Sequence, residues 1–157
     1  MEIPAALRPA AKRAILATGA LGPIGAFSST ADIASIAGWW GYLLAQYSKY
    51  YGYSLDSESA KKICSSALLG MGAYYVGCKA ATRLFNLIPM AGPPAAMGIS
   101  SLTNVVFTYR FAVTLSRIFA NGAVDLDTLA ASIKVMFAGT GDGLLNLRQI
   151  VNLYWKY

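Results

Sequence analysis

A helical period of apolar residues runs along almost the whole chain and constrains the fold more than any other feature of the sequence. No segment alternates apolar and polar residues for long enough to indicate a β-strand. Glycine and proline interrupt the period at a few places, and these breaks divide the chain into about six predicted helices. No linker, internal repeat or shift in composition separates them, so residues 1–157 predict a single all-α domain.

Helix-terminal residues set the expected boundaries. Asp56 and Glu58 stand where the third helix starts, and acidic side chains favour that end of the helix dipole. Gly52 is the C-terminal glycine expected after the second helix, and residues 22–29 are expected to form a turn before it. The helices are expected at residues 9–20, 30–51, 56–87, 95–120, 125–138 and 144–157.

Proline and glycine also separate the third helix from the fourth, and we expect a hairpin turn there. The turn residues are Pro89, Gly92, Pro93 and Pro94. The turn makes the two helices a long hairpin, which we expect at the centre of the fold. Residues 123–157 are expected to add C-terminal amphipathic helices.

Charged side chains are sparse. The chain has 13 basic and 7 acidic residues, or 13% of its length, against about 25% in ordinary soluble domains. The hydrophobic fraction is 56% and the mean hydropathy is +0.48. This composition excludes intrinsic disorder, and two cysteines are too few for a disulfide-rich scaffold. Lipid is therefore the predicted surroundings of part of the surface.

The sequence offers no set of residues for catalysis. It contains no histidine, which removes the commonest general base and metal ligand. Cys64 and Cys78 are separated by about 21 Å along one predicted helix, so they cannot share a metal ion. The glycine-rich segment 139–143 lacks the lysine, followed by a hydroxyl residue, that ends a phosphate-binding loop. We predict no enzymatic activity and no cofactor.

Small residues recur at fourfold spacing in two predicted helices. Residues four apart share one helix face, and the two stripes are Ala37, Gly41 and Ala45, and Ala73, Gly77 and Ala81. Glycine inside a helix costs about 1 kcal/mol relative to alanine, which close approach of two backbones would offset. Helices associate in this way in lipid. The alternative is a water-soluble bundle with one tight crossing.

The charge-free stretches are short for a bilayer. They cover residues 33–48, 63–78 and 95–109, and the longest reach about 24 Å as helices, less than the roughly 30 Å of a hydrocarbon core. Charges at their ends would have to extend to the lipid headgroups. The charges expected to be buried or to flank the membrane are Asp32, Lys79, Arg83, Arg110 and Arg117. Spanning, a re-entrant hairpin and peripheral docking all stay open.

Asp32 opens a strongly apolar helix, where an unpaired charge is costly. It is expected to pair with Arg110 or Arg83; a polar helix end in water is the equal alternative. The net charge of +6 suits an anionic partner. The basic residues are scattered beside apolar helices and form no stripe with interleaved aromatic residues, so a lipid surface is predicted and nucleic acid is not.

Several motifs together resemble a known family. They are Pro23-Ile24 before Asp32, Tyr51-Gly52-Tyr53, Ser57-Glu58-Ser59-Ala60-Lys61, Ile88-Pro89-Met90-Ala91-Gly92, Thr108-Tyr109-Arg110 and Arg117-Ile118-Phe119. Over roughly residues 20–122 the chain resembles the YcjF-type domain of unknown function, a glycine-rich α-helical module. The module stands at the C-terminus of bacterial inner-membrane proteins and of dynamin-like or Era-like GTPases. The family commonly shows Ile-Pro-Gly-x-Gly, where this chain has Met90 in place of the first glycine.

The resemblance implies association with the bacterial inner membrane and a separate GTPase partner, because this chain carries no GTPase domain. It implies no catalytic residue. We therefore expect a non-enzymatic, membrane-associated module that anchors or remodels and that assembles as a homo-oligomer through its small-residue stripes. A pore-forming, toxin-like helical protein and a soluble helical adaptor or carrier of apolar ligands are the alternatives.

Overall fold

The computed structural model describes residues 3–27, 29–70, 92–122, 124–125 and 128–139, and every regular element in these ranges is a helix. The all-α prediction is confirmed for this part of the chain. The helices are η1 (Ala5–Leu7, a single 3-10 turn), α1 (Arg8–Ala20), α2 (Gly22–Phe27), α3 (Ser29–Tyr50), α4 (Ser57–Gly70), α6 (Gly92–Ala120) and α7 (Leu129–Gly139).

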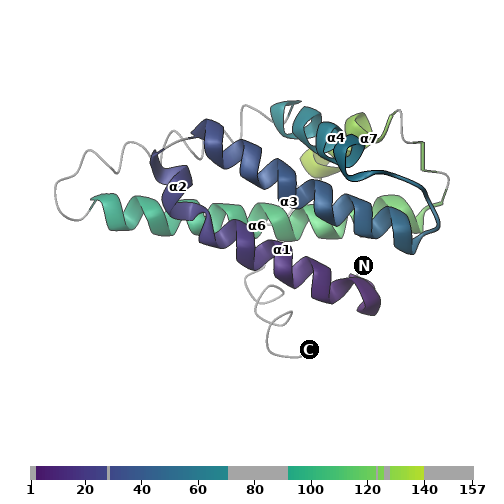
Figure 1. Cartoon of the computed structure of the whole chain (residues 1–157), viewed down its shortest axis with the longest axis horizontal. Coiled ribbons are helices and arrows are strands. Elements are labelled where there is room, and N and C mark those ends of the chain that lie inside the picture. Colours follow the sequence, from purple (N-terminus) through teal and green to yellow (C-terminus); the bar gives the residue numbers. More distant parts are fainter. Residues whose placement is uncertain (1–2, 28, 71–91, 123, 126–127, 140–157) are drawn as a thin grey trace.

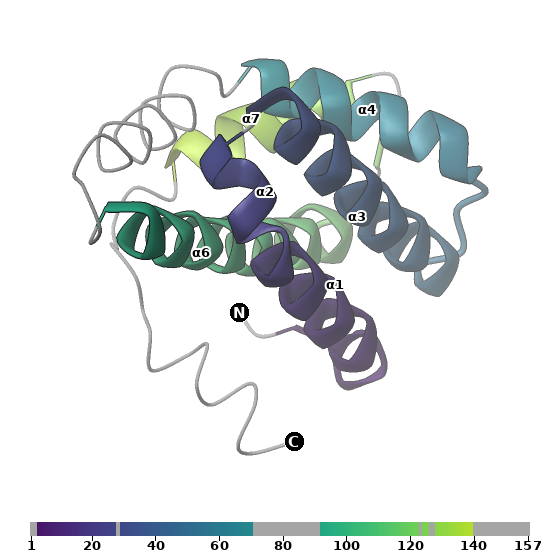
Figure 2. The ribbon, with the colours of Figure 1, turned by 60° about the vertical axis from the view of Figure 1, so that its left-hand side comes forward.

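The long helix α6 is the central element (Figure 1). Helices α1 and α2 follow one another along it, and α3 lies against α1, α2 and α6 (Figure 2). Helix α4 packs on α3, and α7 contacts α4 and α6. The described helices thus form a bundle in which α6 touches helices from both ends of the chain.

The predicted central hairpin is not formed by α4 and α6. Helix α4, the described part of the helix expected at residues 56–87, packs against α3 and α7. Among the described helices, the principal neighbours of α6 are α1, α2, α3 and α7. The rest of the predicted third helix, with Pro89, lies outside the described residues, as does the helix expected at residues 144–157.

Residues 22–29 do not form the predicted turn, because Gly22–Phe27 is helix α2. Proline ends a helix in its interior but is tolerated in the first turn, where backbone N–H groups have no intrahelical partner. Pro23 takes that position in α2, and Leu21 alone separates α1 from α2. Because proline is tolerated in a first turn, α6 begins at Gly92 and includes Pro93 and Pro94 in that turn. These two prolines were expected in a hairpin loop.

Other helix ends follow local chemistry. The Asp56 Oδ1 atom accepts hydrogen bonds from the N–H groups of Glu58 and Ser59, each at 2.9 Å, and so caps α4. Gly52 has a φ of 82°, the left-handed conformation expected after a helix. Helix α7 begins at Leu129 rather than at Asp125, whose Oδ2 atom accepts a 2.8 Å hydrogen bond from the Thr128 hydroxyl.

The core lies where α3 meets α6, with side chains from α1, α4 and α7 around it. Its largest fully buried side chains include Trp40, Tyr47, Phe111, Ile15 and Ile133. Among the described residues, no helix is both long enough and apolar enough to cross a bilayer.

Candidate functional site: a polar seam and a basic outer face

Small residues bring α1 and α2 very close to α6. A Cβ atom on Gly22 would lie 2.6 Å from the backbone N and Cα of Ser101 and would overlap the Ser101 hydroxyl. A Cβ atom on Gly19 would lie 2.8 Å from Cγ2 of Val105. The backbones of α2 and α6 can approach this closely only because residue 22 has no side chain.

Hydrogen bonds between buried side chains join the same helices. The Thr108 Oγ1 atom accepts a hydrogen bond from Trp40 Nε1 at 3.0 Å and lies 3.0 Å from the Thr18 hydroxyl oxygen. The Thr18 hydroxyl also lies 3.1 Å from the carbonyl oxygen of Ile15. Asn104 Nδ2 donates to the Thr18 carbonyl oxygen at 3.0 Å. One connected set of polar groups therefore links α1, α3 and α6 inside the protein.

We name this contact the polar seam. Its members are Thr18 and Gly19 on α1, Gly22 on α2, and Ser100, Ser101, Asn104 and Thr108 on α6. None of these side chains titrates near neutral pH. The seam is held by close fit and by hydrogen bonds rather than by large apolar side chains.

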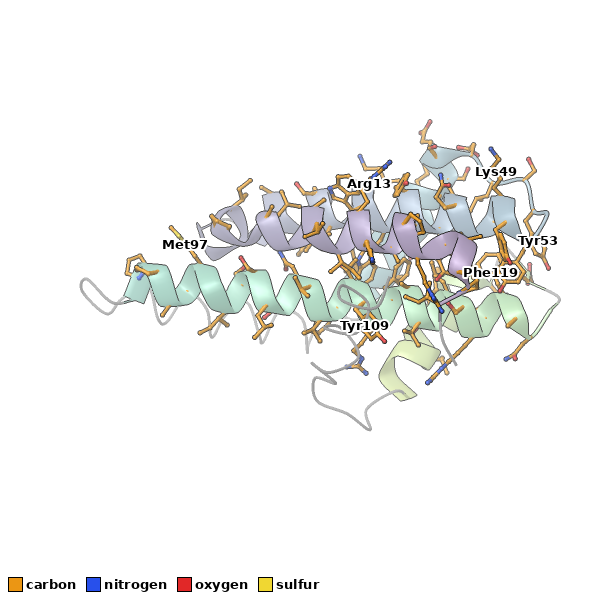
Figure 3. The ribbon with its side chains drawn as sticks, turned by 90° about the horizontal axis from the view of Figure 1, so that it is seen from below. Arg13, Lys49, Tyr53, Met97, Tyr109 and Phe119 are labelled. Atoms are coloured by element: carbon orange, nitrogen blue, oxygen red, sulfur yellow. The ribbon has the colours of Figure 1, made fainter. Side chains whose placement is uncertain are left out.

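The other half of α6 makes a different contact, which we name the aromatic end. It consists of Trp40, Tyr47, Tyr51, Tyr53, Phe111 and Phe119. The Trp40 and Phe111 rings stack with centroids 4.1 Å apart. Figure 3 shows Tyr53 and Phe119 together at this end, with Met97 near the opposite end of α6.

Tyr47 carries the principal polar contact of the aromatic end. Its hydroxyl donates to the Ala112 carbonyl oxygen at 2.9 Å and lies 2.9 Å from the Ser116 Oγ atom. Burial raises the pKa of this hydroxyl well above its usual range, although the hydrogen bond with Ser116 acts in the opposite direction. The phenol therefore stays neutral and acts as a structural group.

The surface of α1 and α2 turned away from the bundle combines basic and apolar residues. We name it the outer face, and it consists of Lys12, Arg13, Leu16, Ala20, Pro23 and Ile24. Leu16 is 62% exposed and Ile24 is 47% exposed. Residues 3–27 include three basic residues and no acidic residue. Arg8, the third, is held inward by a 3.1 Å hydrogen bond from its Nε atom to the Ile3 carbonyl oxygen.

The residues of the first predicted small-residue stripe lie on α3. A Cβ atom on Gly41 would lie 3.0 Å from the N and Cα atoms of Lys61, so this glycine sits where α3 crosses α4. Ala37 is buried and Ala45 is half-buried. The second predicted stripe, Ala73, Gly77 and Ala81, lies outside the described residues.

The structure describes the side chains of two of the five predicted charges. Arg110 and Arg117 are half-buried on α6. Lys79 and Arg83 lie outside the described residues, and Asp32 belongs to α3 but its side chain is not described. Pairing of Asp32 with Arg110 or Arg83 stays a prediction.

The polar seam was missed by the reading of the sequence, although its signal is present there. On α6 a small or polar residue recurs at every fourth position and is buried throughout: Ala96, Ser100, Asn104, Thr108, Ala112 and Ser116. The two predicted stripes consist of Ala and Gly and lie in the helices expected at residues 30–51 and 56–87. Counting Ser, Thr and Asn as members of such stripes would have found it.

The described residues hold no group of three or more histidine, cysteine, aspartate or glutamate side chains that could bind a metal ion. Cys64 is buried on α4, and burial raises the pKa of its thiol, so it stays protonated. Comparison of the chain with family models, with curated proteins and with solved structures gives no match. The resemblance to the YcjF-type module therefore stays a prediction.

Proposed function

We propose that this chain is a non-enzymatic helical module that associates with a membrane surface. The observation that carries the proposal is the polar seam. Its helices meet through glycine and through hydrogen bonds of Thr18, Asn104 and Thr108. Interfaces of this kind hold helices together where hydrophobic exclusion contributes little, as it does in lipid.

The surface beside the seam supports the same proposal. Leu16 on α1, Ile24 on α2 and Leu102 on α6 are large apolar residues with exposed side chains. The chain carries a net charge of +6, which favours contact with anionic lipid headgroups. Peripheral association is the form proposed, because no described helix has the length and apolarity to cross a bilayer.

Cell fractionation followed by a carbonate wash tests this function. We expect the chain to sediment with membranes and to be released by carbonate, as a peripheral protein is. Recovery in the aqueous extract at low salt, with a single monodisperse species in buffer, would contradict the proposal and favour a soluble adaptor. Release of a trapped dye from vesicles by the purified chain would instead indicate pore formation.

A role in anchoring or remodelling, assembly as a homo-oligomer and a separate GTPase partner extend this proposal. The last rests on the resemblance to the YcjF-type module. Crosslinking of the membrane-bound chain tests oligomer formation: a ladder of multiples of the monomer mass supports it, and monomer alone contradicts it. Co-purification of a GTPase with the crosslinked chain tests the partner.

A further inference from the structure

We propose that the outer face of α1 and α2 is the docking surface for an anionic lipid bilayer. This inference rests on the proposed function and names the part of the molecule that performs it. On α1 the side chains of Pro9, Arg13, Leu16 and Ala20 are exposed at intervals of three or four residues, so they share one face of the helix. Ile24 on α2 continues this face.

Charge complementarity selects the occupant. Lys12 and Arg13 are the basic members of the face, and neither forms an ion pair within the described part of the chain. No acidic residue occurs between Ile3 and Phe27 to oppose their attraction to lipid phosphates. A second copy of this chain docked symmetrically would bring the same cations together, which disfavours that contact.

The apolar members of the face suit a bilayer better than a nucleic acid. Leu16 lies one turn beyond Lys12 and Arg13, and Ile24 lies further along the same surface. Basic side chains followed by exposed apolar ones are typical of helices that lie in the membrane plane, with cations at the headgroups and apolar side chains among the acyl chains. Nucleic acid would leave Leu16 and Ile24 without a partner.

The polar seam holds this face in place. Gly22 and Gly19 bring α2 and α1 against Ser101 and Val105 of α6, and Asn104 ties α1 to α6 from beneath. The outer face is thus presented by packed helices, so its cations and apolar side chains keep a fixed spacing. The ordering of these helices is complete before the chain meets the bilayer, which favours binding.

Flotation with vesicles tests the inference. Purified full-length chain is mixed with vesicles of phosphatidylcholine alone, or of phosphatidylcholine with phosphatidylglycerol, at low and high salt. The test variants are Lys12→Gln/Arg13→Gln and Leu16→Ser/Ile24→Ser. The matched controls are Lys49→Gln/Lys61→Gln, which removes the same charge from exposed positions on α3 and α4, and Val135→Ser, which removes an exposed apolar side chain from α7.

We expect the wild type to float with the anionic vesicles at low salt. Lys12→Gln/Arg13→Gln should lower partitioning roughly thirty-fold, and Leu16→Ser/Ile24→Ser roughly ten-fold or more. The two control variants should each change it by less than about three-fold, because neither removes a member of the outer face. Circular dichroism and thermal unfolding check that each variant folds; the substituted side chains are not buried, so all should.

The outcomes separate the inference from the function on which it rests. Equal losses in the Lys12/Arg13 variant and in the Lys49/Lys61 variant would overturn the docking face while leaving membrane binding in place. If Lys12→Gln/Arg13→Gln lowered partitioning to the vesicles and Leu16→Ser/Ile24→Ser left it unchanged, insertion of the apolar residues would be overturned. Failure of the wild type to float with either vesicle would overturn both proposals. Binding to RNA but not to vesicles would assign the face to nucleic acid instead.

Discussion

The two halves of α6 hold the same bundle together in different ways. At the aromatic end, Tyr47 of α3 and Phe111 and Phe119 of α6 bury large rings between the two helices. At the polar seam, Thr18 of α1 and Asn104 and Thr108 of α6 bury small polar groups between the two helices. Burial of ring area is favourable wherever water is the alternative and tolerates some misfit. The seam depends on close fit and on every buried polar group finding a partner.

The difference bears on the proposed function. Contacts of the aromatic end need water outside to be strong, whereas hydrogen bonds of the seam keep their value beside lipid. The outer face lies on α1 and α2, the helices that the seam holds. The part of the molecule proposed to meet the membrane is therefore the part whose packing depends least on water.

The largest expected effect comes from removing a ring of the aromatic end. Phe111→Ala should lower the free energy of unfolding by about 3–5 kcal/mol, because a fully buried ring is lost and a cavity is left. Leu102→Ala, at an exposed position of the same helix, should change it by less than about 1 kcal/mol. Urea denaturation measures both. A cost below about 1 kcal/mol for Phe111→Ala would show that this end contributes little.

A methyl group in the polar seam should give the next largest effect. Gly22→Ala should lower the free energy of unfolding by about 1–3 kcal/mol, since its Cβ would meet the backbone of Ser101. Gly38→Ala is the matched control, because a Cβ there would meet no atom of the described residues within 4 Å. It should stabilise α3 by up to about 1 kcal/mol. Thermal unfolding distinguishes them, and equal effects would contradict the close approach.

Hydroxyl removal in the same helix tests whether the seam depends on its hydrogen bonds. Thr108→Val keeps the shape but leaves the Trp40 N–H without its acceptor, which should cost about 1–2 kcal/mol. The buried Thr114 hydroxyl has no hydrogen-bond partner within the described structure, so Thr114→Val should be neutral or stabilising. Denaturation of the two variants in parallel is the measurement, and a neutral Thr108→Val would refute the polar role of the seam.

Alkaline pH should lower the free energy of unfolding by a smaller amount, through groups that lie outside the polar seam. Burial raises the pKa of the Cys64 thiol above its ordinary value of 9.0 and that of the Tyr47 hydroxyl above 10.0. Both groups then ionise more readily in the unfolded chain, so stability is fully present below these ordinary values and falls as pH rises through them. From pH 7 to pH 9 Cys64 should cost about 0.4 kcal/mol, and Tyr47 adds to the loss above pH 10.

Unfolding midpoints in urea, measured across this pH range, give the slope of stability against pH. The Cys64→Ala variant should lose the part of the slope below pH 9, whatever its stability at neutral pH. Thr108→Val should keep the whole slope, because the seam holds no group that titrates there. An unchanged slope in Cys64→Ala would contradict the assignment.

Much of the helical framework could be predicted, and the errors have a common cause. The ends of α1, α3 and α6 fall close to their expected positions, because apolar period and capping residues act locally. Gly22-Pro23 and Gly92-Pro93-Pro94 were read as turns, yet both open helices. A proline after a helix and a proline in the first turn of the next look alike in sequence.

The candidate site was less predictable from the same information. Gly41 and Ala37 belonged to a predicted stripe, and the structure places Gly41 against α4. The polar seam was not predicted, because Thr18, Asn104 and Thr108 look like ordinary polar positions until their partners are known. The outer face could have been read from the basic residues of α1, yet the exposure of Leu16 required the packed helices.

By itself, the sequence determined that this protein is helical, poor in charge and basic, since these properties depend on composition and on neighbours within a few residues. Tertiary structure alone decided which helices meet and which small residues are needed. Among the described residues, a methyl group on Gly22 would meet the backbone of Ser101, and one on Gly38 would meet no atom. The Thr108 hydroxyl accepts a hydrogen bond from Trp40, 68 residues away, while the Thr114 hydroxyl has no partner in the same part of the chain. Such differences arise because the space and the partners around a side chain come from segments distant in the chain.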